Sequence, residues 1–114
     1  MRVINLEAGM PTSDAAMILL NNRIYAERAS GAGAVKIIHG YGSTGKGGAI
    51  RKVCRQKLLE YRRRGIIKDI CPGEKFGPFD EEGRRLSQKC PEARSDADWG
   101  RANPGVTIVL FKQV

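Results

Sequence analysis

The chain has 114 residues, 41% of them hydrophobic and 28% charged, a composition that indicates one folded domain and excludes disorder of the whole chain. Its net charge of +8 favours polyanionic partners, such as a nucleic acid, a ribosome or an anionic membrane surface. No apolar run approaches the roughly 18 residues that span a bilayer and the first residues lack the apolar region of a signal peptide, so we expect a cytoplasmic protein without a membrane anchor.

The first two elements are a strand and a helix. Residues 2–6 predict a short strand, and Thr12 or Ser13 can cap a helix that continues to about Arg28. The glycine-containing stretch 30–33 ends this helix. Apolar residues recur in it at helical spacing and should form its buried face: Ala16, Met17, Leu19, Leu20 and Ile24.

A second strand and helix follow. Residues 34–38 are nearly all apolar, as in a central strand that helices cover. Residues 39–48 form a glycine-rich turn, and a helix runs from about 48 to 64. The buried face of this helix should contain Ile50, Val53, Cys54, Leu58 and Tyr61.

The remaining chain predicts two more strands, at residues 66–70 and 106–111. Residues 71–105 between them are too long for an ordinary connection and form an insert, which a short helix near 80–88 interrupts. The order β-α-β-α-β-β predicts an α/β fold, a two-layer sandwich of a mixed four-stranded sheet and two helices. We expect residues 1–114 to be a single domain.

Positive charge is concentrated in the middle of the chain. Residues 46–68 contain nine Lys or Arg and one acid, Glu60, whereas residues 69–98 contain eight acids and five bases. Such a run is either an ordinary solvated face or a surface for a polyanion, and the scarcity of acids favours the polyanion. Arg51 is the expected first contact because it lies in the first turn after the glycine-rich turn.

The glycine-rich turn between a strand and a helix is suited to binding phosphate. Backbone N–H groups and the helix dipole favour an anion there, and glycines let the phosphate approach closely. Residues 40–47 match the pattern Gly-x4-Gly-Lys of a nucleotide-binding P-loop, but Gly47 occupies the position that needs a Ser or Thr hydroxyl for magnesium. We therefore expect no hydrolysis of free nucleotides, and a nucleic-acid phosphate as the ligand.

Three stretches carry a resemblance to a known family. Residues 35–42 form a strand that ends in His-Gly-x-Gly, residues 47–52 open a helix with an apolar-Arg pair, and residues 104–109 begin a closing strand. Together they resemble the Smr (small MutS-related) domain. The resemblance implies a two-layer α/β fold like the C-terminal domain of a bacterial translation initiation factor. It also implies binding of DNA or RNA and, as in several members, endonuclease activity in DNA repair and recombination or in ribosome rescue.

The first motif of that family is absent. The family has Leu-Asp-Leu-His-Gly, and its acidic and histidine side chains are tied to cleavage, whereas Asn5 and Glu7 stand at those positions when Ala8 is treated as an extra residue. Aligned from Gly9 instead, Leu6 and Ala8 stand there. The candidate acid–base groups are therefore His39 and Glu7. The alternative interpretation is a catalytically inactive module that binds a protein or a ribosomal surface.

The predicted interface follows from the loop and the helix after it. His39 either contacts the ligand or holds the loop through a backbone hydrogen bond. We expect contacts to nucleic acid from His39, Gly40, Tyr41, Gly42, Gly45, Lys46, Gly47, Gly48, Arg51, Lys52 and Arg55.

No cofactor or metal site is expected, although the Glu7 carboxylate could hold a divalent metal ion, an alternative that the sequence does not support further. Cys54, Cys71 and Cys90 are widely spaced and His39 is the single histidine, so three reduced thiols are expected. In the insert, Asp96 and Asp98 are too few to predict a cation site. Trp99 either stacks on an unpaired base or packs the insert onto the domain.

Overall fold

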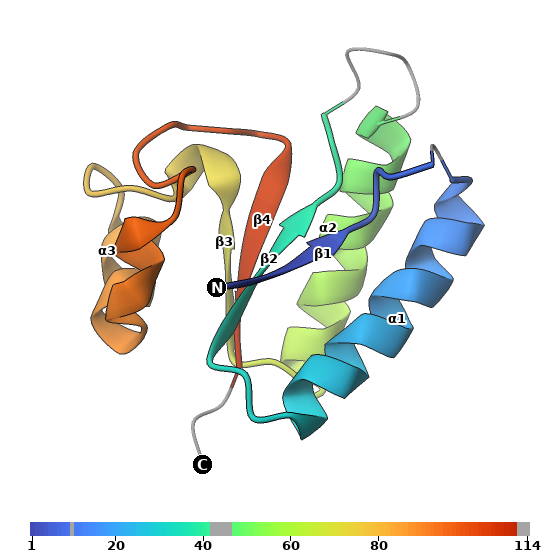
Figure 1. Cartoon of the computed structure of the whole chain (residues 1–114), viewed down its shortest axis with the longest axis horizontal. Coiled ribbons are helices and arrows are strands. Elements are labelled where there is room, and N and C mark those ends of the chain that lie inside the picture. The colour runs from blue at the N-terminus through green and yellow to red at the C-terminus, as the bar shows by residue number, and fades with distance from the viewer. Residues whose placement is uncertain (10, 42–46, 112–114) are drawn as a thin grey trace.

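The four strands form one mixed sheet in the order β1-β2-β4-β3 (Figure 1). The computed structural model describes residues 1–9, 11–41 and 47–111. Strand β1 (Arg2–Asn5) pairs in parallel with β2 (Ala34–Ile38), and β4 (Val106–Leu110) pairs antiparallel with β2 and with β3 (Asp69–Pro72). The predicted α/β class and mixed sheet are confirmed.

Two long helices cover one face of the sheet. Helix α1 (Ser13–Ala29) begins at Thr12, whose hydroxyl accepts a hydrogen bond from Ala15 N at 3.1 Å. Helix α2 (Gly47–Arg63) packs beside it (Figure 1). Their buried side chains join those of the sheet in one core, to which these two helices contribute Ala16, Leu20, Ile24, Ile50, Cys54, Leu58 and Tyr61. Leu19 and Val53, expected in the buried faces, are 39% and 36% exposed.

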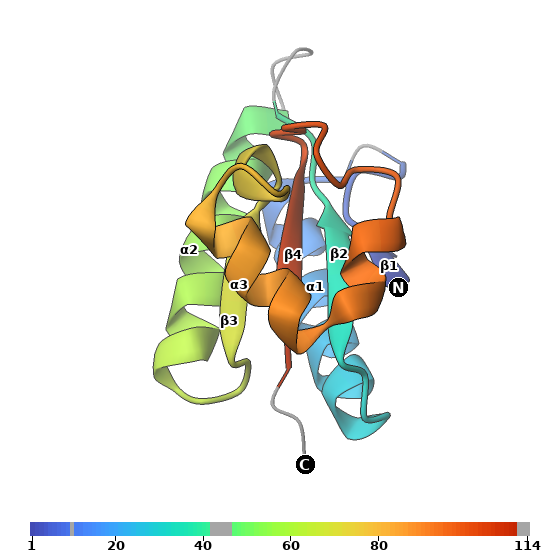
Figure 2. The same ribbon diagram turned by 90° about the vertical axis from the view of Figure 1, so that its left-hand side faces the viewer.

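The insert covers the other face of the sheet. It contains two short 3-10 turns, Gly73–Lys75 and Pro91–Ser95, and helix α3 (Glu81–Lys89), close to the predicted position. Figure 2 shows α3 and the following turn lying across β4 and β2. A second apolar core lies beneath them, made of Ala34, Cys71, Phe76, Leu86, Cys90, Ala93, Ile108 and Leu110. The predicted two-layer arrangement therefore has a third layer. Strand β4 permits this because it carries apolar side chains on both of its faces.

The third strand begins later than predicted. Ile66 and Ile67 are buried but lie in the turn after α2, and β3 starts at Asp69. Ile66 N donates to Tyr61 O at 2.9 Å, which closes the C-terminus of the helix. The apolar pair therefore seals the end of the core and does not extend the sheet.

An ion cluster fastens the insert to the centre of the sheet. Lys36 of β2 lies 3.0 Å from Asp96 Oδ2 and 2.8 Å from Asp98 Oδ2, with all three side chains largely buried. Burial opposes the positive charge, but the hydrogen bonds to Asp98 and Asp96 outweigh it and raise the pKa of Lys36. These two aspartates therefore act as partners of a lysine.

Three further predictions concern thiols, Trp99 and membrane spans. Cys54, Cys71 and Cys90 are buried and free. Trp99 packs edge to face on Phe76, with 5.1 Å between ring centroids. Over the described ranges, no helix has the length and apolarity to cross a membrane.

Candidate nucleic-acid interface

The two described ends of the predicted loop, residues 39–41 and 47–48, lie where several strands end. The last residues of β1, β2 and β3, the start of β4 and the start of α2 meet at one edge of the sheet (Figure 1). We call it the strand-end edge and define it as Glu7, His39 to Tyr41, Gly47 to Arg55, Gly73, Glu74 and Gly105 to Thr107. His39 N and Gly40 N both donate to Gly105 O at 3.0 Å, which joins the glycine-rich loop to the start of β4. In open α/β sheets, this edge is the usual place for a ligand.

His39 is fully buried and holds the loop from beneath. Its Nδ1 lies 2.7 Å from Gly40 O and its Nε2 lies 2.8 Å from Thr107 Oγ1. A carbonyl oxygen only accepts, so Nδ1 carries the proton and Nε2 accepts from the Thr107 hydroxyl. Burial, reinforced by the charges of Arg55 and Arg51, lowers the pKa of His39 to about 4. The ring is therefore neutral near pH 7, with both nitrogens in use.

Arg55 continues this hydrogen-bond chain to Glu74. Arg55 Nε donates to Thr107 Oγ1 at 3.1 Å, while Nη2 and Nη1 donate to the two carboxylate oxygens of Glu74 at 2.7 and 3.0 Å. Arg51 Nη2 also donates to Glu74, at 2.7 Å. Burial acts to raise the pKa of Glu74, but the Arg55 hydrogen bonds outweigh it and lower the pKa to about 2. One carboxylate therefore serves two guanidinium groups.

We expected the basic stretch 46–68, which includes α2, to have no acidic partner apart from Glu60, and this expectation was wrong. Glu74 pairs with Arg51 and Arg55, and Asp69 pairs with Arg62 at 3.3 Å. Sequence reasoning missed Glu74 because its contacts cross between elements 19 and 23 residues apart. Its place directly after Pro72-Gly73, four residues beyond the predicted strand 66–70, was the available signal.

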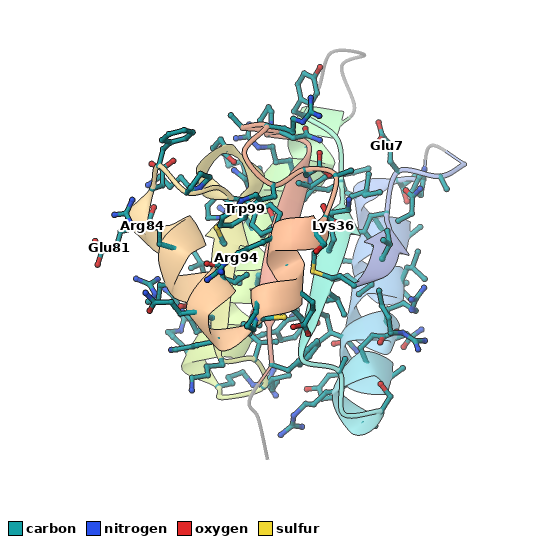
Figure 3. The ribbon with its side chains drawn as sticks, turned by 60° about the vertical axis from the view of Figure 1, so that its left-hand side comes forward. Glu7, Lys36, Glu81, Arg84, Arg94 and Trp99 are labelled. Atoms are coloured by element: carbon teal, nitrogen blue, oxygen red, sulfur yellow. The ribbon has the colours of Figure 1, made fainter. Side chains whose placement is uncertain are left out.

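Glu7 reaches the same edge from β1. Asn5 Oδ1 accepts hydrogen bonds from Glu7 N at 2.9 Å and Ala8 N at 3.0 Å, which fixes the turn after the strand. The Glu7 carboxylate lies against Gly40, since a Cβ built there would be 3.0 Å from Oε1. Gly40 has φ +74°, a conformation that favours glycine. Glu7 and His39 thus flank one residue, and Figure 3 shows Glu7 at this edge.

The other predicted contact residues are distributed as follows. Tyr41 is 55% exposed, Gly47 opens α2, and the first turn of that helix contains no acid. Gly42, Gly45 and Lys46 fall outside the described residues. A shallow hollow beside the start of α2 is lined by Gly48, Arg51, Lys52, Arg55, Gln56 and Leu59. Within the described ranges, no three His, Cys, Asp or Glu side chains gather as a metal site.

Comparison with known proteins supports the fold. No family model matches the sequence, and no curated protein matches it. Among solved structures, the Smr domain of Thermus thermophilus MutS2 is similar, with a TM-score of 0.61 and 19% sequence identity. The alignment covers 98% of this chain and 99% of that one. The chain therefore has the α/β fold of an Smr domain.

Proposed function

We propose that this chain is a nucleic-acid-binding domain and that its strand-end edge contacts the phosphate backbone. The observation that carries the proposal is the group Arg51, Lys52 and Arg55, which lies in the first half of α2 and lines one shallow hollow. The Smr-like fold and the sequence resemblance support the same function.

The charges of this group are only partly neutralised. Glu74 provides one negative charge for Arg51 and Arg55 together. Lys52 is exposed and has no ion pair within the described part of the chain. The positive end of the helix dipole adds to their field. A phosphate here gains charge-assisted hydrogen bonds from arginine N–H groups that Glu74 leaves free.

We assign His39 a positioning role in this proposal. Its ring is buried and bonded at both nitrogens, so it holds Gly40 and leaves the phosphate to the side chains above it.

Binding is tested by fluorescence anisotropy with labelled single-stranded, duplex and branched DNA and RNA, over a series of salt concentrations. We expect log affinity to fall linearly with log salt. Arg51→Gln with Lys52→Gln should weaken binding about tenfold and flatten the slope by about 2.

The matched control removes one charge from the other end of α2 and one from the turn that follows it, through Arg63→Gln with Lys68→Gln. Both side chains are exposed. An equal loss in both double variants would refute a specific role for the edge. Partners that remain bound in a lysate pull-down after nuclease treatment would favour the protein-binding alternative.

Cleavage is a second candidate function, which the position of Glu7 favours. An exposed carboxylate beside Gly40 is placed to accept a proton from water that attacks a phosphodiester bound at this edge. His39 would act by holding Gly40. Nuclease-free preparations of the parent and Glu7→Gln are incubated with labelled substrates, with and without divalent cations. Equal cleavage by both would remove Glu7 from the assignment, and binding would be unaffected by that result.

A further inference from the structure

A second hollow lies on the face that the insert covers, away from the basic helix. It is lined by Pro78, Arg84, Ser87, Gln88, Arg94 and Trp99. Figure 3 shows Arg84, Arg94 and Trp99 on this face, with Arg94 beside Trp99. The hollow is therefore built wholly by the insert, from α3 and the segments on either side of it.

Trp99 gives the hollow a fixed aromatic wall. One part of its indole packs edge to face on Phe76, at an interplanar angle of 82°. Gly100 N donates to Phe76 O at 2.9 Å, which fixes the backbone next to the ring. The half-buried indole keeps an exposed part that lines the hollow. A flat side chain held in this way loses little entropy when a ring stacks on it.

The two arginines supply positive charge that no carboxylate neutralises among the described residues. Arg84 Nη1 donates to Pro78 O at 3.0 Å, a neutral partner that orients its guanidinium. Arg94 is exposed and forms no ion pair in the described part of the chain. Glu81 lies near Arg84 at the outer rim (Figure 3), but the two form no ion pair in the described part of the chain. By contrast, the neighbouring Arg85 is paired with Asp69.

A second aromatic residue adjoins the hollow in sequence. Phe79 directly follows Pro78, which lines the hollow, and is 87% exposed, so its ring is available to a ligand. Aromatic rings alternating with arginines are the combination that binds unpaired nucleotides, because bases stack on the rings and phosphates contact the guanidiniums. An acidic peptide would use the arginines and leave both rings without a matching surface.

We propose that this hollow binds unpaired nucleotides, with bases stacking on Trp99 and Phe79 and phosphates contacting Arg84 and Arg94. The inference rests on the proposed function and deepens it: the ligand of this domain contains a single-stranded segment. The segment 99–105 begins at Trp99 of the hollow and ends at Gly105 of the strand-end edge. We therefore expect one nucleic-acid strand to contact both surfaces.

Trp99 is the only tryptophan, so its fluorescence reports on the hollow directly. The whole chain is titrated with an unlabelled 12-nucleotide homopyrimidine strand and, separately, with a duplex of the same length. We expect the single strand to quench Trp99 emission and the duplex to leave it unchanged. Phe79→Ala should lower the binding constant measured by quenching about tenfold, the usual scale for one stacked base. Arg94→Gln should lower it as well, through the loss of a charge-assisted contact to phosphate.

The control variant is Arg28→Gln, an exposed arginine on α1, which lies across the sheet from the hollow. It should leave the quenching constant unchanged, and circular dichroism melts check that every variant is folded. An excess of polyglutamate peptide should not displace the strand.

The outcomes separate the two proposals. Anisotropy binding without any change in Trp99 emission overturns the hollow and leaves the strand-end edge intact. Quenching that persists in the double variant Arg51→Gln with Lys52→Gln supports binding at the hollow independently, even if the strand-end edge does not bind nucleic acid. Displacement by polyglutamate, or equal losses for Arg28→Gln and Arg94→Gln, overturns the assignment of unpaired nucleotides.

Discussion

Arg55 and Glu74 form a two-pronged ion pair, 2.7 and 3.0 Å long, that joins α2 to the turn after β3. Through this pair, Glu74 affects the stability of the fold and the binding of a phosphate in opposite directions. It stabilises the fold at the strand-end edge, and it reduces the positive charge available to a phosphate.

Replacing Glu74 should therefore lower the stability of the domain and raise its affinity for nucleic acid. Glu74→Gln should lower the free energy of unfolding by about 1 to 3 kcal/mol, the range for a hydrogen bond to a charged group. It should also tighten nucleic-acid binding severalfold at low salt and steepen the salt dependence by about 1, because Arg51 and Arg55 are released. Denaturant unfolding and anisotropy measure the two effects.

Asp69→Asn is the matched control, since Asp69 also serves two arginines, Arg62 and Arg85, at the opposite end of β3. It should reduce stability without tightening binding. Equal gains in affinity for both variants would mean that the net charge of the domain determines affinity, whichever end of β3 carries the substitution.

The buried ring of His39 should make stability depend on pH in one window. On unfolding, its pKa returns from about 4 to about 6.5, so between these values the unfolded chain takes up a proton that the folded chain does not. The free energy of unfolding should fall as the pH drops from 6.5 to 4, by about 3 kcal/mol in total. Above this window the contribution is fully present.

Urea unfolding at pH 7 and pH 5 tests this. His39 is the only histidine, and the low pKa of Glu74 places its own contribution below pH 4.5. His39→Gln should therefore abolish the difference between the two pH values, whatever its effect at pH 7. A difference that persists in His39→Gln would show that another group titrates there.

Lys36 should control how firmly the insert is attached. Lys36→Met leaves Asp96 and Asp98 largely buried without their cation, and we expect a loss of about 3 kcal/mol. Hydrogen exchange of the backbone from 96 to 103 should accelerate more than that of α1. Adding Asp96→Asn and Asp98→Asn to Lys36→Met should restore part of the stability. No recovery in the triple variant would argue against charge as the cause.

Gly73 should tolerate no side chain. A Cβ at this position would overlap the carbonyl oxygen of Asn103 and lie 2.6 Å from Val106 O. Gly73→Ala should lower stability by about 2 kcal/mol or more, since neither backbone group can move freely. Gly31→Ala is the comparison, because its Cβ meets open space and only its φ of +79° is unfavourable, at a cost of about 1 kcal/mol. A thermal melt that ranks the two in the reverse order would contradict this account.

The periodic parts of the fold could be predicted from sequence. Helices α1 and α2 and strands β2 and β4 follow from patterns within 20 residues or fewer, and they lie where expected. The start of β3 was misjudged because Ile66 and Ile67 have the apolarity of a strand but close a helix end. Local composition cannot distinguish an apolar pair within a strand from an apolar pair that packs at the end of a helix.

The candidate site was predicted only in part for a related reason. The residues around His39 and Arg51 were identified from the loop pattern, since strand, glycines and basic helix adjoin in sequence. The contacts of Thr107 with His39 and Arg55, and of Glu74 with Arg55, join residues 19 to 68 positions apart. Such contacts depend on which strands neighbour one another, and in this sheet β4 lies between β2 and β3.

Pro72 and Thr107 face each other in the β3–β4 ladder, so the insert leaves and rejoins the sheet at the same rung. The core beneath α1 and α2 draws no member from residues 73–105. The segment is thus separable from that core, and a short hairpin turn could close β3 onto β4, but Glu74 and Gly105 of the strand-end edge would be lost with it. Such a deletion would expose Cys71, Ile108 and Leu110 to solvent, so a shortened chain would need polar residues at these positions.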